Sequence, residues 1–285
     1  MRSSRRLLAM LAATLELALS PALAAEIDHS EYGVFLEKYV RNGLVDYRAV
    51  EGEDGRLAAY LGRLGAVDPE DFDGWEREAK IALWINAYNA VTIHGIAINY
   101  PIEYGGLIAR ARFPESSIRQ IAGFWDTVFV NVVGAEITLN QIEHQILRRE
   151  FPDPRIHFSL VCASMGCPVL SNDAYQGKLL QRQLERDVRR FINDEDKVRL
   201  DRSENRIYVS RIFKWYAEDF RAEEAPQWLQ KYPERYRGVM ETVARYVARS
   251  DRDYMVERAP SLEFLDYDWS LNELDPGVRG EDGAH

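Results

Sequence analysis

The sequence predicts an α+β protein in which many helices surround a small, largely antiparallel sheet within a single domain. Helical and hairpin patterns are mixed along the chain, without the regular strand–helix alternation of a parallel sheet. The strongest helical pattern, at residues 79–99, is apolar on nearly all sides, which is typical of a buried helix. Alternating segments flank turn residues at 128–139 and at 198–209, and each pair predicts a hairpin.

The remaining elements follow from apolar spacing and from the turn residues between segments. Further helices are expected at residues 30–40, 56–64, 140–150, 175–193, 212–220, 227–231 and 235–248. Extended segments are expected at 45–50 and 262–269. A run of apolar residues at 156–162 predicts a buried strand.

The N-terminal end of the chain has the pattern of a cleavable export signal, residues 1–24. Three arginines lie among the first six residues, an apolar run follows at 7–19, and small residues close the segment. Because a membrane-spanning helix needs about 20 apolar residues, the run is too short for a retained anchor. We therefore expect an exported protein, periplasmic or extracellular, with no membrane span after signal cleavage.

The mature chain is expected to form one globular domain at residues 25–274, followed by a disordered, Gly-rich acidic tail at 275–285. With 46% hydrophobic residues, the chain can bury a full core. The formal net charge of −10 disfavours nucleic-acid binding. No phosphate loop, dinucleotide fingerprint or Gly-x-Ser-x-Gly elbow is present, and we expect no cofactor. The composition leaves the oligomeric state open.

Three polar residues interrupt the buried helix at 79–99 and form the first candidate group. Asn86, Asn89 and His94 fall on one arc of the helix about 140° wide, by the helical period. Buried amides and imidazoles need hydrogen-bond partners. The arc therefore either faces a site or holds neighbouring loops by hydrogen bonds.

Glu143 and His144 form the second candidate group, at the start of the helix expected at 140–150. Asn140 followed by Glu143 resembles a capping box, which explains Glu143 structurally. His144 lies in the first helical turn, where the helix dipole disfavours the imidazolium. A neutral imidazole suits a general base, although a hydrogen bond to a neighbour explains the residue equally well.

The two cysteines, Cys162 and Cys167, lie in a short segment that follows the expected strand at 156–162. Cys162 is a candidate nucleophile if a base lowers its pKa. Two other interpretations stay open: Cys162 is a small core residue, or the two cysteines form a local disulfide or redox pair. Metal ligation by His94, His144, His157 and Cys162 has little support, because no recognised ligand spacing is present, and no metal is expected.

Several segments together resemble one protein family, the domain of unknown function 547 family. The matching segments read KIALWINAYNAVTIHG at 80–95, IEHQILR at 142–148, DPRIHF at 153–158, LVCA at 160–163 with CP at 167–168, KWY at 214–216 with DF at 219–220, and YDWSLN at 267–272. The resemblance covers roughly residues 30–272. It implies an exported bacterial protein and mildly favours thiol chemistry, because some relatives are joined to thiol-redox domains, but it implies no substrate. The matched candidate positions are Asn86, Tyr88, Asn89, His94, Glu143, His144, Arg155, His157, Cys162 and Cys167.

Two classes of function fit these patterns. In the first, the protein is a thiol-dependent hydrolase or transferase: Cys162 attacks a small-molecule or peptide substrate, His144 is the base, and Asn86 or Asn89 orients the base or the substrate. Tyr88, His94, Glu143, Arg155 and His157 are then the candidate binding residues.

In the second class, the chain is a non-catalytic binding domain of the cell envelope, or holds a redox or metal site at the same residues. Its aromatic residues could then line a groove for a peptide or sugar, or could simply be core. The tryptophans in question are Trp84, Trp125, Trp215, Trp228 and Trp269.

Overall fold

The computed structural model describes residues 26–52, 55–222 and 226–275. The expected export signal, and all of the expected tail except its first residue, lie outside these ranges. Helices predominate in the described residues, and three small sheets accompany them, so the predicted α+β class is confirmed. Within these same ranges, no helix has the length and apolar character needed to cross a bilayer.

The elements follow one another in this order: α1 (Ser30–Tyr39), β1 (Val40–Arg41), β2 (Leu44–Val45), α2 (Tyr47–Glu51), α3 (Arg56–Gly65), α4 (Pro69–Asp73), α5 (Arg77–Ala97), α6 (Leu107–Arg112), η1 (Ile118–Gln120), α7 (Phe124–Thr127), β3 (Phe129–Val132), β4 (Ala135–Thr138), η2 (Gln141–Leu147), α8 (Arg148–Glu150), η3 (Pro154–Phe158), η4 (Gly177–Leu179), α9 (Leu180–Ile192), β5 (Val198–Asp201), β6 (Arg206–Val209), α10 (Arg211–Trp215), η5 (Ala217–Asp219), η6 (Leu229–Lys231), α11 (Glu234–Tyr246), α12 (Arg249–Arg258) and β7 (Ser261–Phe264). The η2 element is a π-helix, and the other η elements are 3-10 helices.

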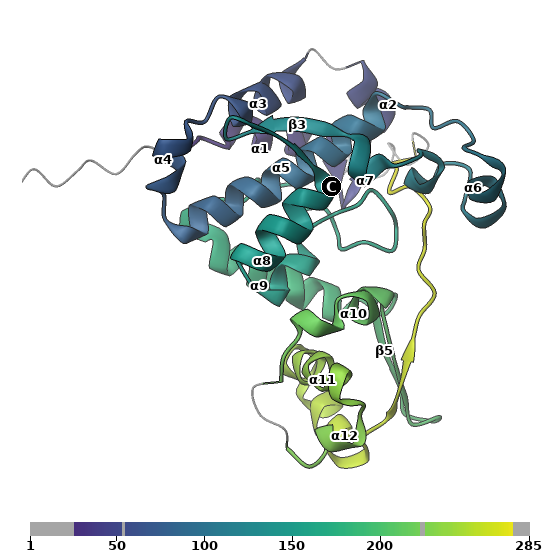
Figure 1. The fold of residues 1–285 in the computed structure, drawn as a ribbon. Coiled ribbons are helices and arrows are strands. Elements are labelled where there is room, and N and C mark those ends of the chain that lie inside the picture. The colour runs from purple at the N-terminus through teal and green to yellow at the C-terminus, as the bar shows by residue number, and fades with distance from the viewer. Residues whose placement is uncertain (1–25, 53–54, 223–225, 276–285) are drawn as a thin grey trace, which may run out of the picture.

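Two apolar cores organise these elements. The larger core surrounds α5, whose residues are buried on nearly every side, as predicted. The smaller core is built by α9 to α12 and the β5–β6–β7 sheet, which lie below α5 in Figure 1. After β7, the C-terminal segment (yellow) runs back from the smaller part to the larger one (Figure 1). There Leu271 forms an isolated antiparallel β-bridge with Ser164, and Glu273 forms a parallel one with Val45.

The predicted hairpins are both present and antiparallel, as β3–β4 and β5–β6. The third sheet adds β7 parallel to β6, with Ile207 opposite Leu262. The sheets are therefore largely antiparallel, with one parallel pair contributed by a segment distant in the sequence.

The predicted buried strand at 156–162 is wrong. Asp153 caps the 3-10 helix η3 by accepting the Arg155 backbone N–H, and Pro154 suits the first helical position. The chain then runs without regular structure to Cys162. An apolar run is compatible with either a buried loop or a buried strand. Here the side-chain amide of Asn89 on α5 takes the place of a neighbouring strand as the hydrogen-bond partner.

Other expected elements also differ from the structure. The segment 45–50 is mostly helical rather than extended, because the Asp46 carboxylate caps α2 by accepting the Ala49 N–H. The helix expected at 235–248 ends at Tyr246, and α12 follows it without having been predicted. The helix expected at 140–150 begins as the π-helix η2, a form that often occurs at functional sites.

Candidate functional site

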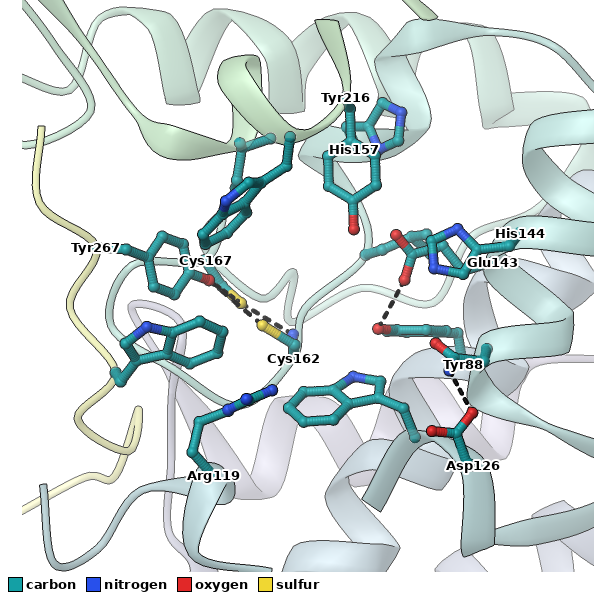
Figure 2. Close-up of a pocket in the computed structure, with 16 residues that line it drawn as sticks. Tyr88, Arg119, Asp126, Glu143, His144, His157, Cys162, Cys167, Tyr216 and Tyr267 are labelled. Carbon is teal, nitrogen blue, oxygen red and sulfur yellow. Dashed lines mark hydrogen bonds between the residues drawn. The ribbon is translucent and has the colours of Figure 1, made fainter. Parts of the chain in front are cut away.

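A pocket of about 450 Å³ lies where residues of the two cores meet (Figure 2). Its wall combines two thiols, two imidazoles, carboxylates, phenols and indoles. The lining residues are Tyr88, Arg119, Trp125, Asp126, Asn140, Glu143, His144, His157, Leu160, Cys162, Cys167, Ile212, Trp215, Tyr216, Tyr267 and Trp269.

The two cysteines form one side of the pocket, and both are free thiols. The Tyr267 hydroxyl lies 3.3 Å from the Cys162 Sγ and 3.1 Å from the Cys167 Sγ. The Ser164 hydroxyl also contacts both sulfurs, at 3.5 and 3.3 Å. The Cys162 backbone N–H donates to the Cys167 Sγ at 3.0 Å. The sulfurs therefore share one set of hydroxyl groups, and the buried Cys167 has the additional backbone donor.

This arrangement shifts the pKa values of the two thiols in opposite directions. Burial alone raises the pKa of Cys167, but the hydrogen bonds with Cys162, Ser164 and Tyr267 outweigh it and lower the pKa from 9.0 to about 6. The hydrogen bond with Cys167, burial and the charge of Cys167 raise the pKa of Cys162 well above its ordinary value. The pair therefore carries one negative charge near neutral pH, and the donors place it on Cys167.

The C-terminal segment holds the cysteine loop in place. The Met165 and Gly166 N–H groups donate to the carbonyls of Ser270 and Asp268 at 2.8 Å. A Cβ on Gly166 would lie 2.7 Å from the ring of Tyr267, so the residue must lack a side chain for that ring to approach. The loop and Tyr267, about a hundred residues apart in the sequence, are thus built as one unit.

Glu143 occupies the opposite side of the pocket and is only 6% exposed. Tyr88 donates its hydroxyl proton to the Glu143 carboxylate at 3.1 Å (Figure 2). Burial first, and then the charge and hydrogen bond of Glu143, raise the pKa of Tyr216. Glu143 is thus a buried carboxylate held by phenols.

The capping role predicted for Asn140 and Glu143 is wrong. Thr138 and Gln141 form the reciprocal pair instead: the Gln141 side chain accepts the Thr138 N–H, and the Thr138 hydroxyl accepts the Gln141 N–H. Asn140 donates its amide proton to the Asp126 carboxylate. The capping box lies two residues earlier in the chain than expected, which leaves Glu143 to face the pocket.

The imidazoles belong to a separate network of charged groups. The His157 Nε2 lies 2.6 Å from the Asp219 carboxylate, and Arg148 donates to the same carboxylate at 2.6 and 3.0 Å. Arg148 also contacts the His144 Nδ1 at 2.9 Å. Burial raises the pKa of Asp219, but the hydrogen bonds from His157 and Arg148 outweigh it and lower the pKa to about 2. Asp219 therefore stays ionised and fixes both neighbours.

His144 lines the same pocket as Cys162 but does not contact it. Within the described ranges, the Cys162 side chain contacts hydroxyl groups, and no imidazole lies within hydrogen-bond distance of either sulfur. Since a guanidinium can only donate, Arg148 makes the His144 Nδ1 an acceptor, and the proton of the neutral imidazole is on Nε2. In this tautomer, His144 offers a donor to the pocket rather than a base.

Asn86 and Asn89 do not line the pocket and serve as structural clamps. Asn86 donates to the Tyr175 carbonyl at 2.8 Å and accepts the Tyr175 N–H at 2.9 Å. Asn89 donates to the Ser159 carbonyl and accepts the Val161 N–H, both at 2.9 Å. The loop-holding interpretation therefore fits both amides. Asn89 still affects the site indirectly, because it fixes the chain just before Cys162.

Two other candidate binding residues lie away from the pocket. His94 is half-buried in the last turn of α5 and does not line the pocket. Arg155 pairs with Asp153 at 2.6 Å and with the Gln181 side chain at 2.7 Å. Of the predicted tryptophans, Trp125, Trp215 and Trp269 line the pocket, whereas Trp84 and Trp228 do not.

The sequence left several pocket residues without a role. Tyr216 and Tyr267 lie in segments that resemble the family, and that resemblance was the one signal available for them. Arg119 gave no signal, because neither spacing nor an expected element marks it. In the described part of the chain, no three metal-ligating residues gather into a cluster that could hold a metal ion.

The fold and site together define an α+β protein with a dithiol pocket. The family model "Protein of unknown function, DUF547" matches residues 72–192. Residues 72–192 thus match the family that the sequence pattern predicted. The matched region contains both cysteines, Glu143 and His144, while Tyr216, Asp219 and Tyr267 lie beyond it. No curated protein and no solved structure matches the chain.

Proposed function

We propose that the protein is a thiol enzyme in which Cys162 and Cys167 act together and exchange a disulfide with a substrate in the pocket. One observation carries this proposal: two free sulfurs lie at one pocket wall and share the hydroxyls of Tyr267 and Ser164. A hydrolase needs a single nucleophilic sulfur, whereas disulfide exchange uses one thiolate and one protonated thiol.

The exchange balances in two steps. Cys162, the less buried of the two cysteines, attacks one sulfur of a substrate disulfide, and its proton passes to the Cys167 thiolate. The substrate S–S bond breaks, and one thiolate leaves. Cys167 then attacks the Cys162 sulfur, forms the internal disulfide and releases the second substrate thiol with its proton. The protein loses two electrons, the substrate gains them, and the reverse sequence oxidises a substrate dithiol.

The test uses dithiodipyridine, a neutral aromatic disulfide, and reads the products by intact mass. We expect the wild-type protein to end with a Cys162–Cys167 disulfide and no attached pyridine thiol. Cys162→Ser and Cys167→Ser are matched to each other, and each should stop at a lasting mixed disulfide on its remaining cysteine. A wild-type protein that keeps one pyridine thiol on each cysteine would overturn the paired mechanism.

A thiol-dependent hydrolase or transferase is the second candidate, because His144 lines the same pocket as Cys162. This function requires Arg148 to release the His144 Nδ1, so that the ring can take the Cys162 proton. Nitrophenyl acetate tests it: turnover that depends on Cys162 and falls sharply in His144→Gln would favour hydrolysis. A single burst without turnover would leave disulfide exchange as the function.

A further inference from the structure

Arg119 extends into the pocket from the edge opposite Glu143 and is held there by aromatic rings (Figure 2). Its guanidinium carbon lies 4.9 Å from the ring centre of Phe113, 5.3 Å from that of Trp269 and 5.6 Å from that of Trp125. Three rings around one guanidinium restrict its rotation and hold its charge at a fixed place. In Figure 2 the guanidinium points toward the part of the pocket that contains Cys162.

The positive charge of Arg119 has no carboxylate partner among the described residues. The ion pairs of the described residues do not include it, although the chain has 46 acidic and 36 Lys and Arg residues. The two carboxylates that share the pocket are already engaged, Asp126 by Asn140 and Glu143 by Tyr88. Arg119 is solvent-exposed, so its guanidinium donors are open to water or to a ligand.

The chemistry of the surroundings indicates which ligand fits. A guanidinium offers two parallel N–H groups that match the two oxygens of a carboxylate. The indoles of Trp125, Trp215 and Trp269 line the same pocket and suit a flat or apolar body next to that carboxylate. An anion bound here would lie in the same pocket as Cys162.

We propose that Arg119 binds a carboxylate of the substrate, so that the protein acts on carboxylate-bearing disulfides or thiols with an aromatic or apolar body. This inference rests on the proposed thiol function for the reaction, but not for the binding. It assigns Arg119 a binding role and leaves the chemistry to the sulfurs.

The first test compares two aromatic disulfides, neutral dithiodipyridine and the dicarboxylate dithiobis-nitrobenzoate. In Arg119→Gln, the reaction rate with the dicarboxylate should fall about tenfold relative to the neutral reagent, the size of effect expected for a charge-assisted hydrogen-bonded pair. Arg112→Gln on α6 is the matched control, since it removes the same charge outside the pocket, and it should leave the ratio near the wild-type value. An unchanged ratio in Arg119→Gln would overturn the proposal.

The second test does not involve the thiols. Benzoate binding is followed by tryptophan fluorescence in the wild-type protein, Arg119→Lys and Arg119→Gln. Affinity should fall in that order, and inorganic phosphate should compete weakly. Equal benzoate binding in all three proteins would overturn the Arg119 assignment, and tighter binding of phosphate than of benzoate would overturn the carboxylate assignment. Failure of dithiodipyridine to react would instead count against the thiol function, and the benzoate result would still decide the role of Arg119.

Discussion

The two sides of the pocket hold their reactive groups by opposite means. On the thiol side, Cys162 and Cys167 contact uncharged hydroxyls and one backbone N–H. On the imidazole side, His144 and His157 are tied to charged groups, Arg148 and Asp219. Neutral donors around a sulfur lower the pKa of the thiol without neutralising its charge, so the sulfur remains reactive.

The charged network on the imidazole side instead occupies the ring nitrogens with hydrogen bonds. Asp219 accepts hydrogen bonds from His157 and Arg148, and Arg148 donates to His144. Each imidazole therefore has one nitrogen committed to a structural partner. Under the proposed function, the sulfurs carry the reaction and the imidazole side serves to hold the structure.

The largest expected effect is on stability and comes from the imidazole side. Asp219→Asn removes the charged acceptor of His157 and Arg148, and should lower the free energy of unfolding by about 2 kcal/mol at neutral pH. Urea denaturation measures this loss. Because the pKa of Asp219 is lowered from 3.8 to about 2 in the folded state, its contribution is complete above pH 3.8 and is lost as the pH falls through about 2. The difference between variant and wild type should therefore shrink in acid.

The Asp219→Asn variant also tests whether the imidazole side affects the reactivity of the thiols. The rate of reaction with dithiodipyridine should stay at the wild-type value in Asp219→Asn, measured where both proteins are folded. A large loss of thiol reactivity would show that the imidazole network takes part in the reaction, and would break the division between the two sides.

A smaller effect on stability, but a direct effect on reactivity, is expected from Tyr267→Phe. The hydroxyl contacts both sulfurs, and its loss should cost about 1 kcal/mol of stability. The pKa of Cys167 should rise, because the hydrogen bond of Tyr267 helps to lower it. Thiol reactivity at pH 7 should therefore fall. Tyr208→Phe on β6, whose hydroxyl contacts the exposed Glu204, is the matched control and should change neither property.

Much of the fold could be predicted from local pattern. The all-apolar α5 and the hairpins β3–β4 and β5–β6 have periods that need no tertiary information. The strand predicted at 156–162 was wrong because an apolar run indicates burial and not conformation. The hydrogen-bond partner of this segment, Asn89, lies on a helix about 70 residues earlier, so local pattern could not reveal it.

The candidate site was predictable only in part, for the same reason. Reactive residue types identified the cysteines and His144, and all three line one pocket. Their partners could not be predicted, because Tyr267 lies about a hundred residues from the cysteines and meets them only when the C-terminal segment returns. Arg119 had no local signature, since its role depends on three aromatic rings that come together in the folded chain.

The pH dependence of thiol reactivity tests the central claim most directly. The rate of the wild-type reaction with dithiodipyridine, followed from acid to alkaline pH, should rise with a midpoint near 6, because the donors around Cys167 hold its pKa at about 6. In Cys167→Ser, the midpoint should move to higher pH. A wild-type midpoint near 9.0, the ordinary thiol value, would contradict the account, since neither sulfur would then be held as a thiolate at neutral pH.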